Sequence, residues 1–218
     1  MKILEYYSKM GGGQVTKDEP RINNVHSLIP RSGAKILDIG CHDGYISKKF
    51  KKEGNIVIGS DIQKGALGVA KQKIDLAILN NLEENWPFKA NSFDYIHMGA
   101  VIEHVFDYHH LFNETNRVLK KGGRLIIGVP NFGHYAHRIQ VMRGKMPWWY
   151  KNFEHIRLWT RDWLKIQLSH HGFEESKFIG CAFRDTLDCR IASYLFPSLM
   201  PLFVMELVKL RNESVSKQ

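Results

Sequence analysis

Five short apolar runs recur along the first 130 residues, each separated from the next by enough residues for a crossover. They span residues 35–39, 56–60, 76–79, 94–98 and 124–129. Apolar residues follow one another in these runs without polar alternation, as in strands that are buried on both faces of a parallel sheet. The runs therefore predict the parallel strands of an α/β domain.

The segments between the runs predict helices. Residues 45–52 follow the first strand, 64–73 follow the second, and 111–119 precede the fifth. In the third helix Leu111, Phe112, Thr115, Val118 and Leu119 share one face, and the pair Gly122 and Gly123 is expected to end it. Because βαβ crossovers are right-handed, this order winds helices onto both faces of one sheet.

The last third of the chain predicts one more helix and two more strands. Residues 160–171 form the helix, with Thr160 as N-cap, Trp163, Leu164 and Leu168 facing inward, and Gly172 at its end. Strands are expected at 173–182 and 202–210, and residues 203–210 should form the closing antiparallel edge strand. The expected fold is α/β, with a doubly wound, mostly parallel seven-stranded sheet and an antiparallel last strand.

Residues 191–210 form a 20-residue, mostly apolar stretch that has the length of a membrane span. Pro197, Pro201, Glu206 and Lys209 argue against a span, because prolines interrupt helices and charges are costly inside a bilayer. A helix that lies on an anionic membrane surface is the alternative, and the basic composition of the chain favours it. The interpretation we prefer is an entry loop at 196–201 followed by the last strand.

The chain divides into an N-terminal arm and helix (1–32), one domain (33–210) and a polar tail (211–218). Within the domain, residues 130–159 are rich in proline, aromatic and basic residues and are too long for an ordinary connection. This insert is interpreted either as a hydrophobic cap on the sheet or as a lid that excludes water and stacks on a substrate.

Composition and charge fit a single soluble domain. The chain has 218 residues, 44% of them hydrophobic and 24% charged, and a net charge of +9. This charge suits an acidic partner such as nucleic acid, an anionic membrane or a phosphorylated substrate, and it also occurs in basic proteins with no such partner. Three cysteines and an N-terminus without a secretory pattern indicate a cytoplasmic protein.

The first strand ends in a glycine turn typical of a cofactor loop. Asp38 precedes Gly40, and Gly44 follows at a Gly-x-x-x-Gly spacing. Glycine permits backbone conformations and close ligand approach that a Cβ would block. An acid at this place repels a pyrophosphate and suits a ligand with an ammonium group, which argues against a nicotinamide dinucleotide.

A second acid, Asp61, ends the second strand 21 residues after Gly40. A carboxylate at that distance from a glycine-rich turn is placed to accept hydrogen bonds from ribose hydroxyls. An aspartate after a strand is more often a loop cap, but its pairing with the first loop favours the ribose interpretation.

Six ordered segments over residues 33–180 give the chain a family resemblance. They are LDIGCHDG, IGSDI, LEENWPFKANSFDYI, HMGAVIEHVFD, NRVLKKGGRLIIGVPN and HIRLWTRDWLKIQLSHHGF. In this order the chain resembles the Rossmann-like class I S-adenosylmethionine-dependent methyltransferases, and in particular their MetW-like and ubiquinone-pathway-like branch.

The resemblance implies a set of cofactor contacts. Asp38, Gly40, Cys41 and Gly44 would lie at the methionine end, Asp61 at the ribose, Asn81 and Leu82 at the adenine, and Met98 at the methionyl portion. His42 and Ile62 are also expected to contact the cofactor. The family usually has glycine where this chain has His42, and aspartate where it has Asn81. The asparagine can still accept a hydrogen bond from the adenine amino group.

The pair Glu103–His104 has two interpretations. In the structural one it opens a helix, with Glu103 in the first turn and His104 partly buried. In the functional one His104 is the base that takes a proton from an acceptor hydroxyl, with His134 and His155 as second choices.

Glu103, His104 and His155 also resemble part of the Glu-x-x-Glu-His metal site of small-RNA-end ribose methyltransferases. That site needs an acid at position 100, where this chain has Ala100. The remaining ligands would hold an oxygen-preferring Mg²⁺ poorly. We therefore expect no metal.

The function expected from this resemblance is transfer of a methyl group from S-adenosylmethionine to a small-molecule or lipid-linked acceptor at oxygen, by in-line alignment. Two alternatives are a non-catalytic S-adenosylmethionine-binding regulatory module and an RNA-end ribose methyltransferase. Peripheral contact with an anionic membrane stays open, nucleic acid is not expected as a partner, and the sequence does not indicate an oligomeric state.

Overall fold

The chain folds around one seven-stranded sheet. A computed structural model describes residues 19–29, 33–51, 54–147, 155–182 and 186–210. The strands run in the order β3-β2-β1-β4-β5-β7-β6. Their bounds are β1 Lys35–Ile39, β2 Ile56–Asp61, β3 Leu76–Leu79, β4 Phe93–Gly99, β5 Leu119–Pro130, β6 Phe173–Cys181 and β7 Leu202–Lys209.

The expected fold class is confirmed. Strands β1 to β5 pair in parallel, and β7 pairs antiparallel with both β5 and β6. The prediction that the last strand forms the edge is wrong, because β7 lies between β5 and β6 and the edge is β6. The burial pattern agrees with this order: nearly every residue of β7 is buried, whereas β6 exposes charged side chains such as Glu174 and Lys177.

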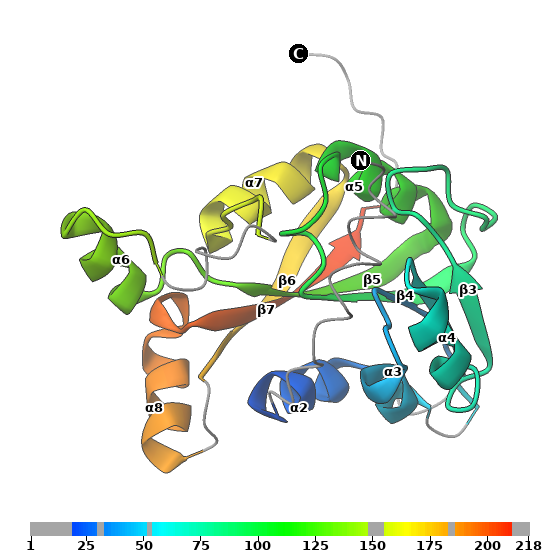
Figure 1. Cartoon of the computed structure of the whole chain (residues 1–218), viewed down its shortest axis with the longest axis horizontal. Coiled ribbons are helices and arrows are strands. Elements are labelled where there is room, and N and C mark those ends of the chain that lie inside the picture. The colour runs from blue at the N-terminus through cyan, green and yellow to red at the C-terminus, as the bar shows by residue number, and fades with distance from the viewer. Residues whose placement is uncertain (1–18, 30–32, 52–53, 148–154, 183–185, 211–218) are drawn as a thin grey trace.

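Helices cover both faces of the sheet, as Figure 1 shows. They are α2 Glu19–Leu28, α3 Tyr45–Phe50, α4 Lys64–Ala70, α5 Tyr108–Val118, α6 Tyr135–Met142, α7 Arg161–His170 and α8 Leu187–Leu195, with a 3-10 turn at Pro197–Leu199. One core cluster joins side chains of α5 and α7 to one face of the sheet, and a second joins α2, α3 and α4 to the other. The two clusters pack both faces of the sheet and so fix the carboxyl ends of β1, β2 and β4 side by side.

The prediction that Gly122 and Gly123 end the helix after β4 is wrong. Helix α5 begins at the N-cap Asp107, whose side chain accepts a hydrogen bond from the His110 backbone N–H, and it ends at Val118. Leu119 is already extended, and Gly122 and Gly123 lie within β5, where the pairing with β4 shifts register. The glycines thus shape an irregular strand entry, with Gly122 at φ +73°.

The structure confirms most of what the sequence predicts for helix α7. Thr160 is the N-cap and accepts a hydrogen bond from the Trp163 backbone N–H, while Leu164 and Leu168 are fully buried. The prediction that Trp163 faces inward is wrong, because its side chain is 49% exposed. The buried face of the helix instead continues through Gln167, which accepts a hydrogen bond from the Tyr108 hydroxyl at 3.0 Å.

The insert contains a helix that the sequence pattern does not predict, α6. Its start is anchored by Asn131, whose side-chain amide donates to the Ser198 and Met200 carbonyls at 2.8 Å each. The insert residues Trp148, Trp149, Tyr150 and Lys151 lie outside the described residues. Residues 191–210 are divided among α8, the 3-10 turn and β7, and no described helix is long and apolar enough to cross a membrane.

Candidate functional site

The loop after β1 folds tightly over the end of that strand. The backbone N–H groups of Gly40 and Cys41 both donate to the Ser60 carbonyl of β2, at 2.8 and 3.1 Å. Gly40, His42 and Gly44 have φ of +70°, +48° and +75°. His42 thus takes a left-handed conformation that glycine adopts without strain, at the position where the resembling family has glycine.

The glycines of this loop are required by packing within the protein. A Cβ on Gly40 would lie 2.5 Å from the Cγ2 of Val101, and a Cβ on Gly44 would lie 3.2 Å from Ala70 of α4. Gly59 of β2 makes room in the same way for the Cys41 sulfur, 2.6 Å from the position of its missing Cβ. Close ligand approach, which the sequence suggested as the reason for these glycines, stays a prediction.

Asp61 connects the ends of β1 and β2. Its Oδ2 accepts a hydrogen bond from the His42 backbone N–H, and its Oδ1 accepts one from the Gln63 backbone N–H, each at 2.8 Å. An ionised carboxylate has about four acceptor positions. Two of them remain after these bonds, so Asp61 can hold the loop and still accept hydrogen bonds from a ligand.

Asp38 lies beneath the loop, on the face of the sheet that α3 covers. Its Oδ1 is 2.7 Å from Nδ1 of His97 on β4, and its Oδ2 accepts a hydrogen bond from the Ser47 hydroxyl of α3. Both Asp38 and His97 are almost completely buried. The structure therefore gives Asp38 a role in holding β1, β4 and α3 together, and its predicted contact with a cofactor stays a prediction.

Cys41 follows Gly40 in the loop, where the charges of Asp38 and Asp61 act on its thiol. Burial raises the pKa of its thiol, and the negative charges of Asp38 and Asp61 raise it further. The thiol thus stays protonated and acts as a small apolar group in the loop.

At the end of β3 the sequence singled out Asn81, and the structure draws attention to its neighbour Asn80. The Asn81 side chain donates to Glu84 at 2.9 Å and accepts from the Glu83 N–H at 3.2 Å, so it closes its own turn, and Leu82 packs against the core. Asn80 is buried, and its Nδ2 has no hydrogen-bond partner among the described residues. Its backbone N–H donates to the Asp61 carbonyl at 2.9 Å. Treating both residues of the Asn80-Asn81 doublet as candidate cofactor contacts would have included Asn80.

The remaining predicted cofactor residues differ in position. Met98 is fully buried within the core cluster on the α5 and α7 face, which is a packing role. Ile62 is half-buried in the turn after β2, next to Asp61. Contacts of either residue with a cofactor stay predictions.

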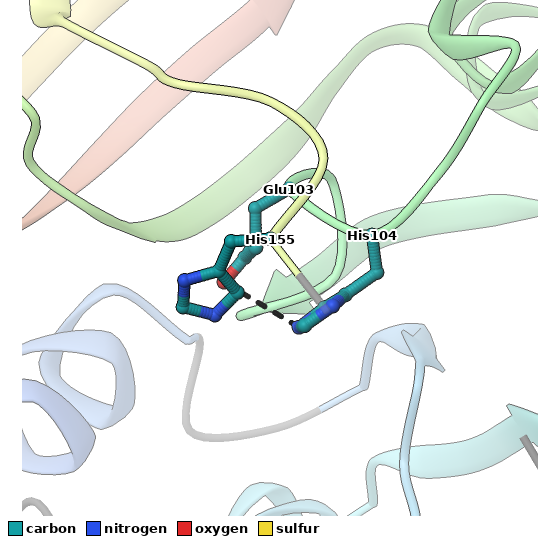
Figure 2. A group of neighbouring side chains, drawn as sticks. All are labelled: Glu103, His104 and His155. Atoms are coloured by element: carbon teal, nitrogen blue, oxygen red, sulfur yellow. Dashed lines mark ion pairs between the residues drawn. The ribbon is translucent and has the colours of Figure 1, made fainter. Parts of the chain in front are cut away.

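Glu103, His104 and His155 come together beyond the carboxyl end of β4, as Figure 2 shows. The prediction that Glu103 opens a helix is wrong: it lies in a turn, because Asp107 supplies the N-cap of α5 four residues later. Nε2 of His104 is 4.0 Å from Oε1 of Glu103, and the rings of His104 and His155 are 4.9 Å apart. Burial raises the pKa of the Glu103 carboxyl, which is almost completely inaccessible to solvent.

His134, one of the second-choice bases, lies at the start of α6. Burial, with a smaller contribution from His137, lowers the pKa of His134 to about 4. An imidazole with so low a pKa is a weak base, so His134 is a poor candidate for proton abstraction. His104 keeps about a quarter of its side chain exposed and remains the better candidate.

The low pKa of His134 predicts a loss of stability in acid. Between about pH 6.5 and pH 4 the unfolded chain binds a proton at this residue that the folded chain excludes, so the free energy of unfolding should fall as the pH falls. At about 1.4 kcal/mol per pKa unit the loss is about 1–3 kcal/mol. Urea unfolding at pH 7.5 and pH 5 measures it. His134→Gln should reduce the difference, whereas His170→Gln, at an exposed position, should leave it unchanged. An equal pH response in both variants would contradict the prediction.

Comparison with known proteins identifies related domains. Residues 19–175 match the family model described as a methyltransferase domain. Demethylmenaquinone methyltransferases of Bacillus cereus and Bacillus anthracis strains are 32% identical over 120 residues, which is 50% of this chain and 48% of theirs. The chain therefore spans about half the length of the curated relatives it matches.

Solved structures share the fold at low sequence identity. A putative methyltransferase of Haloferax volcanii, solved in complex with the Trm112 methyltransferase activator, matches with a TM-score of 0.72 at 17% identity, over 97% of this chain and 99% of that one. A Thermotoga maritima S-adenosylmethionine-dependent methyltransferase, described as a possible histamine N-methyltransferase, matches with a TM-score of 0.68 at 22% identity, over 88% and 89%. These similarities confirm the fold expected from the strand pattern.

Proposed function

The chain belongs to the methyltransferase-domain family, a family of S-adenosylmethionine-dependent enzymes, and from this premise we propose that it transfers a methyl group from S-adenosylmethionine to an acceptor oxygen. The proposed acceptor is a small molecule or a lipid-linked molecule. The MetW-like and ubiquinone-pathway-like branch, suggested by the Glu-His-Val-x-Asp signature at residues 103–107, is part of the same proposal.

The observation that carries the proposal is the arrangement at the ends of β1, β2 and β3. Asp61 holds the Gly40–Gly44 turn through the His42 N–H and keeps acceptor positions free for ribose hydroxyls. Asn80 follows directly on β3, and its buried Nδ2, which has no hydrogen-bond partner among the described residues, can donate to a polar edge of an adenine. These donors and acceptors fit an aminoacyl nucleoside.

S-adenosylmethionine supplies a methyl group on a sulfonium, which is already a good leaving group. The protein then has to bind and align the acceptor and to accept a proton. His104 lies beyond the β4 end, where Val101 packs against Gly40 of the cofactor turn. Its imidazole can take a proton from an acceptor hydroxyl, and we assign it this role.

The acceptor class rests on the relatives and on the surface of the chain. Demethylmenaquinone methyltransferases act, by their name, on a demethylmenaquinone, which supports a quinol-like, lipid-linked acceptor here. Exposed apolar side chains follow α8 at helical spacing, and the chain carries a net charge of +9. This face of α8, made by Leu187, Ile191, Tyr194 and Leu195, is proposed to contact an anionic membrane that holds the acceptor.

Calorimetry with S-adenosylmethionine and S-adenosylhomocysteine tests cofactor binding, and product formation with hydroxylated acceptors, demethylated quinols among them, tests turnover. We expect both ligands to bind and at least one hydroxylated acceptor to be methylated at oxygen. Absence of binding by both ligands overturns the proposal. Binding without turnover supports the regulatory module instead, and methylation of RNA ends that depends on divalent ions supports the ribose methyltransferase.

Cosedimentation with vesicles tests the membrane contact. The chain should bind vesicles rich in phosphatidylglycerol and lose most of this binding when Leu187 and Tyr194 are both replaced by serine. Leu79→Ser, at an exposed apolar position on β3, is the matched control and should bind normally. Equal binding by both variants, or none by the native chain, would rule out the α8 face as the contact.

A further inference from the structure

Two segments that lie more than 50 residues apart in the chain are joined next to the β4 end. The backbone N–H groups of Ile156 and Arg157 donate to the Glu103 carbonyl at 3.0 and 3.2 Å. The Arg157 guanidinium donates to the Val105 and Phe106 carbonyls of the same turn. These bonds fix the backbone next to His155 against the turn that carries Glu103 and His104, so the three side chains are brought together by structure that does not depend on a ligand.

The Glu103 carboxylate is the unusual member of this group. Its side chain is only 1% exposed, and neither of its oxygens accepts a hydrogen bond from any described residue. Nε2 of His104 lies 4.0 Å from Oε1 of Glu103, which is too long for a hydrogen bond. Buried carboxylates are normally paired, hydrogen-bonded or bound to a metal ion, because leaving them without a partner is costly.

We propose that Glu103, His104 and His155 bind a divalent transition-metal ion of the zinc and cobalt class. One ligand atom from each of the three lies within 4.8 Å of the others, and they are the only such group of His, Cys, Asp or Glu found within the described ranges. Two ligands of one zinc ion lie about 3.4 Å apart in tetrahedral geometry. Small side-chain rotations therefore suffice to close the site.

The donor set determines the kind of metal. Two imidazoles and one carboxylate are typical ligands of zinc, whereas magnesium and calcium prefer six or more oxygens. This revises the sequence-based expectation of no metal, which considered only magnesium and the missing acid at Ala100. Three protein ligands leave a fourth position open for water, or for an acceptor oxygen if the methyl-transfer proposal holds. With the ion bound, His104 is a ligand and not a free base, so the base role proposed above belongs to the metal-free chain.

Cobalt and zinc titrations of the metal-free full-length chain, without S-adenosylmethionine or acceptor, test the site. We expect one Co²⁺ per chain with the intense visible absorption of a low-coordinate ion, displacement of Co²⁺ by Zn²⁺, and no response to Mg²⁺. Because neither cofactor nor acceptor is present, failure of the methyl-transfer proposal would leave this result unaffected. A native chain that binds no Co²⁺ overturns the metal site.

Variants locate the metal. Glu103→Gln keeps the shape of the side chain, and His155→Ala removes a second ligand; each should weaken Co²⁺ binding at least about tenfold and change the absorption spectrum. His109→Ala is the matched control, because Nδ1 of His109 lies 3.2 Å from Nε2 of His171 in an exposed histidine pair elsewhere. Unchanged affinity in both cluster variants, or an equal loss in the control, would contradict the assignment. Thermal unfolding without metal confirms that each variant is folded, and His104→Ala replaces any that is not.

Discussion

Replacing Asp38 by alanine is expected to lower the free energy of unfolding by about 3–5 kcal/mol. Asp38 pairs with His97 at 2.7 Å where both side chains are only 3% exposed, and it also accepts a hydrogen bond from Ser47. Alanine leaves the His97 ring nitrogen and the Ser47 hydroxyl buried without this partner, and the cost of such groups is much larger than the net gain from forming the bonds. The pair also joins β1 to β4 next to the proposed cofactor turn. The substitution should therefore also disturb the proposed cofactor site.

Urea unfolding of Asp38→Ala, His97→Ala and the double variant measures this effect. The two single losses should not add, because each variant already breaks the same pair, and the coupling energy reports the interaction. Asp94→Ala is the control: Asp94 pairs with Lys120 at 2.7 Å in a site that is about one third exposed, and its loss should cost about 1 kcal/mol. Additive losses, or equal losses at Asp38 and Asp94, would show that the buried pair is not a stabilising unit.

The sequence predicts the strands well, because their signal is local. Each parallel strand is a run of consecutive apolar residues, and all five runs became strands. Four have nearly the predicted bounds, whereas β5 begins at Leu119, five residues before the predicted start. The place of β7 inside the sheet was not predictable in this way, because it depends on which strand pairs with β5. In the structure nearly every residue of β7 is buried, as expected of a strand with a neighbour on each side.

The site shows the same division between local and long-range information. Asp61 and Gly40 could be selected because each follows directly on an apolar run, where ligands bind in parallel sheets. The contact of His155 with Glu103 could not be derived from spacing, because it depends on backbone bonds from Ile156 and Arg157 to a distant turn. The partner of Asp38 was missed for a similar reason: His97 is its neighbour across two parallel strands.

Asp61→Ala is expected to weaken S-adenosylmethionine binding by about a hundredfold. Hydrogen bonds to a charged group contribute about 1.5–3 kcal/mol each, so the loss of two from the ribose hydroxyls amounts to about 3 kcal/mol or more. The variant also releases the His42 and Gln63 N–H groups, which now fix the turn over β1. Calorimetry measures the affinity, and circular dichroism checks that the variant is folded.

Asp75→Ala provides the matched comparison for Asp61. Asp75 also accepts a hydrogen bond from a backbone N–H, that of Val57 at 2.9 Å. It precedes β3, however, and so lies at the amino ends of the parallel strands, away from the proposed site at their carboxyl ends. Its loss removes a similar bond without touching the proposed cofactor turn. The affinity for S-adenosylmethionine should therefore stay within about twofold of the native value, because a ligand at the carboxyl ends of the strands does not reach the amino ends. A native affinity in Asp61→Ala would remove the ribose contact from the proposal, and an equal loss in both variants would mean that affinity follows stability rather than a carboxylate at the site.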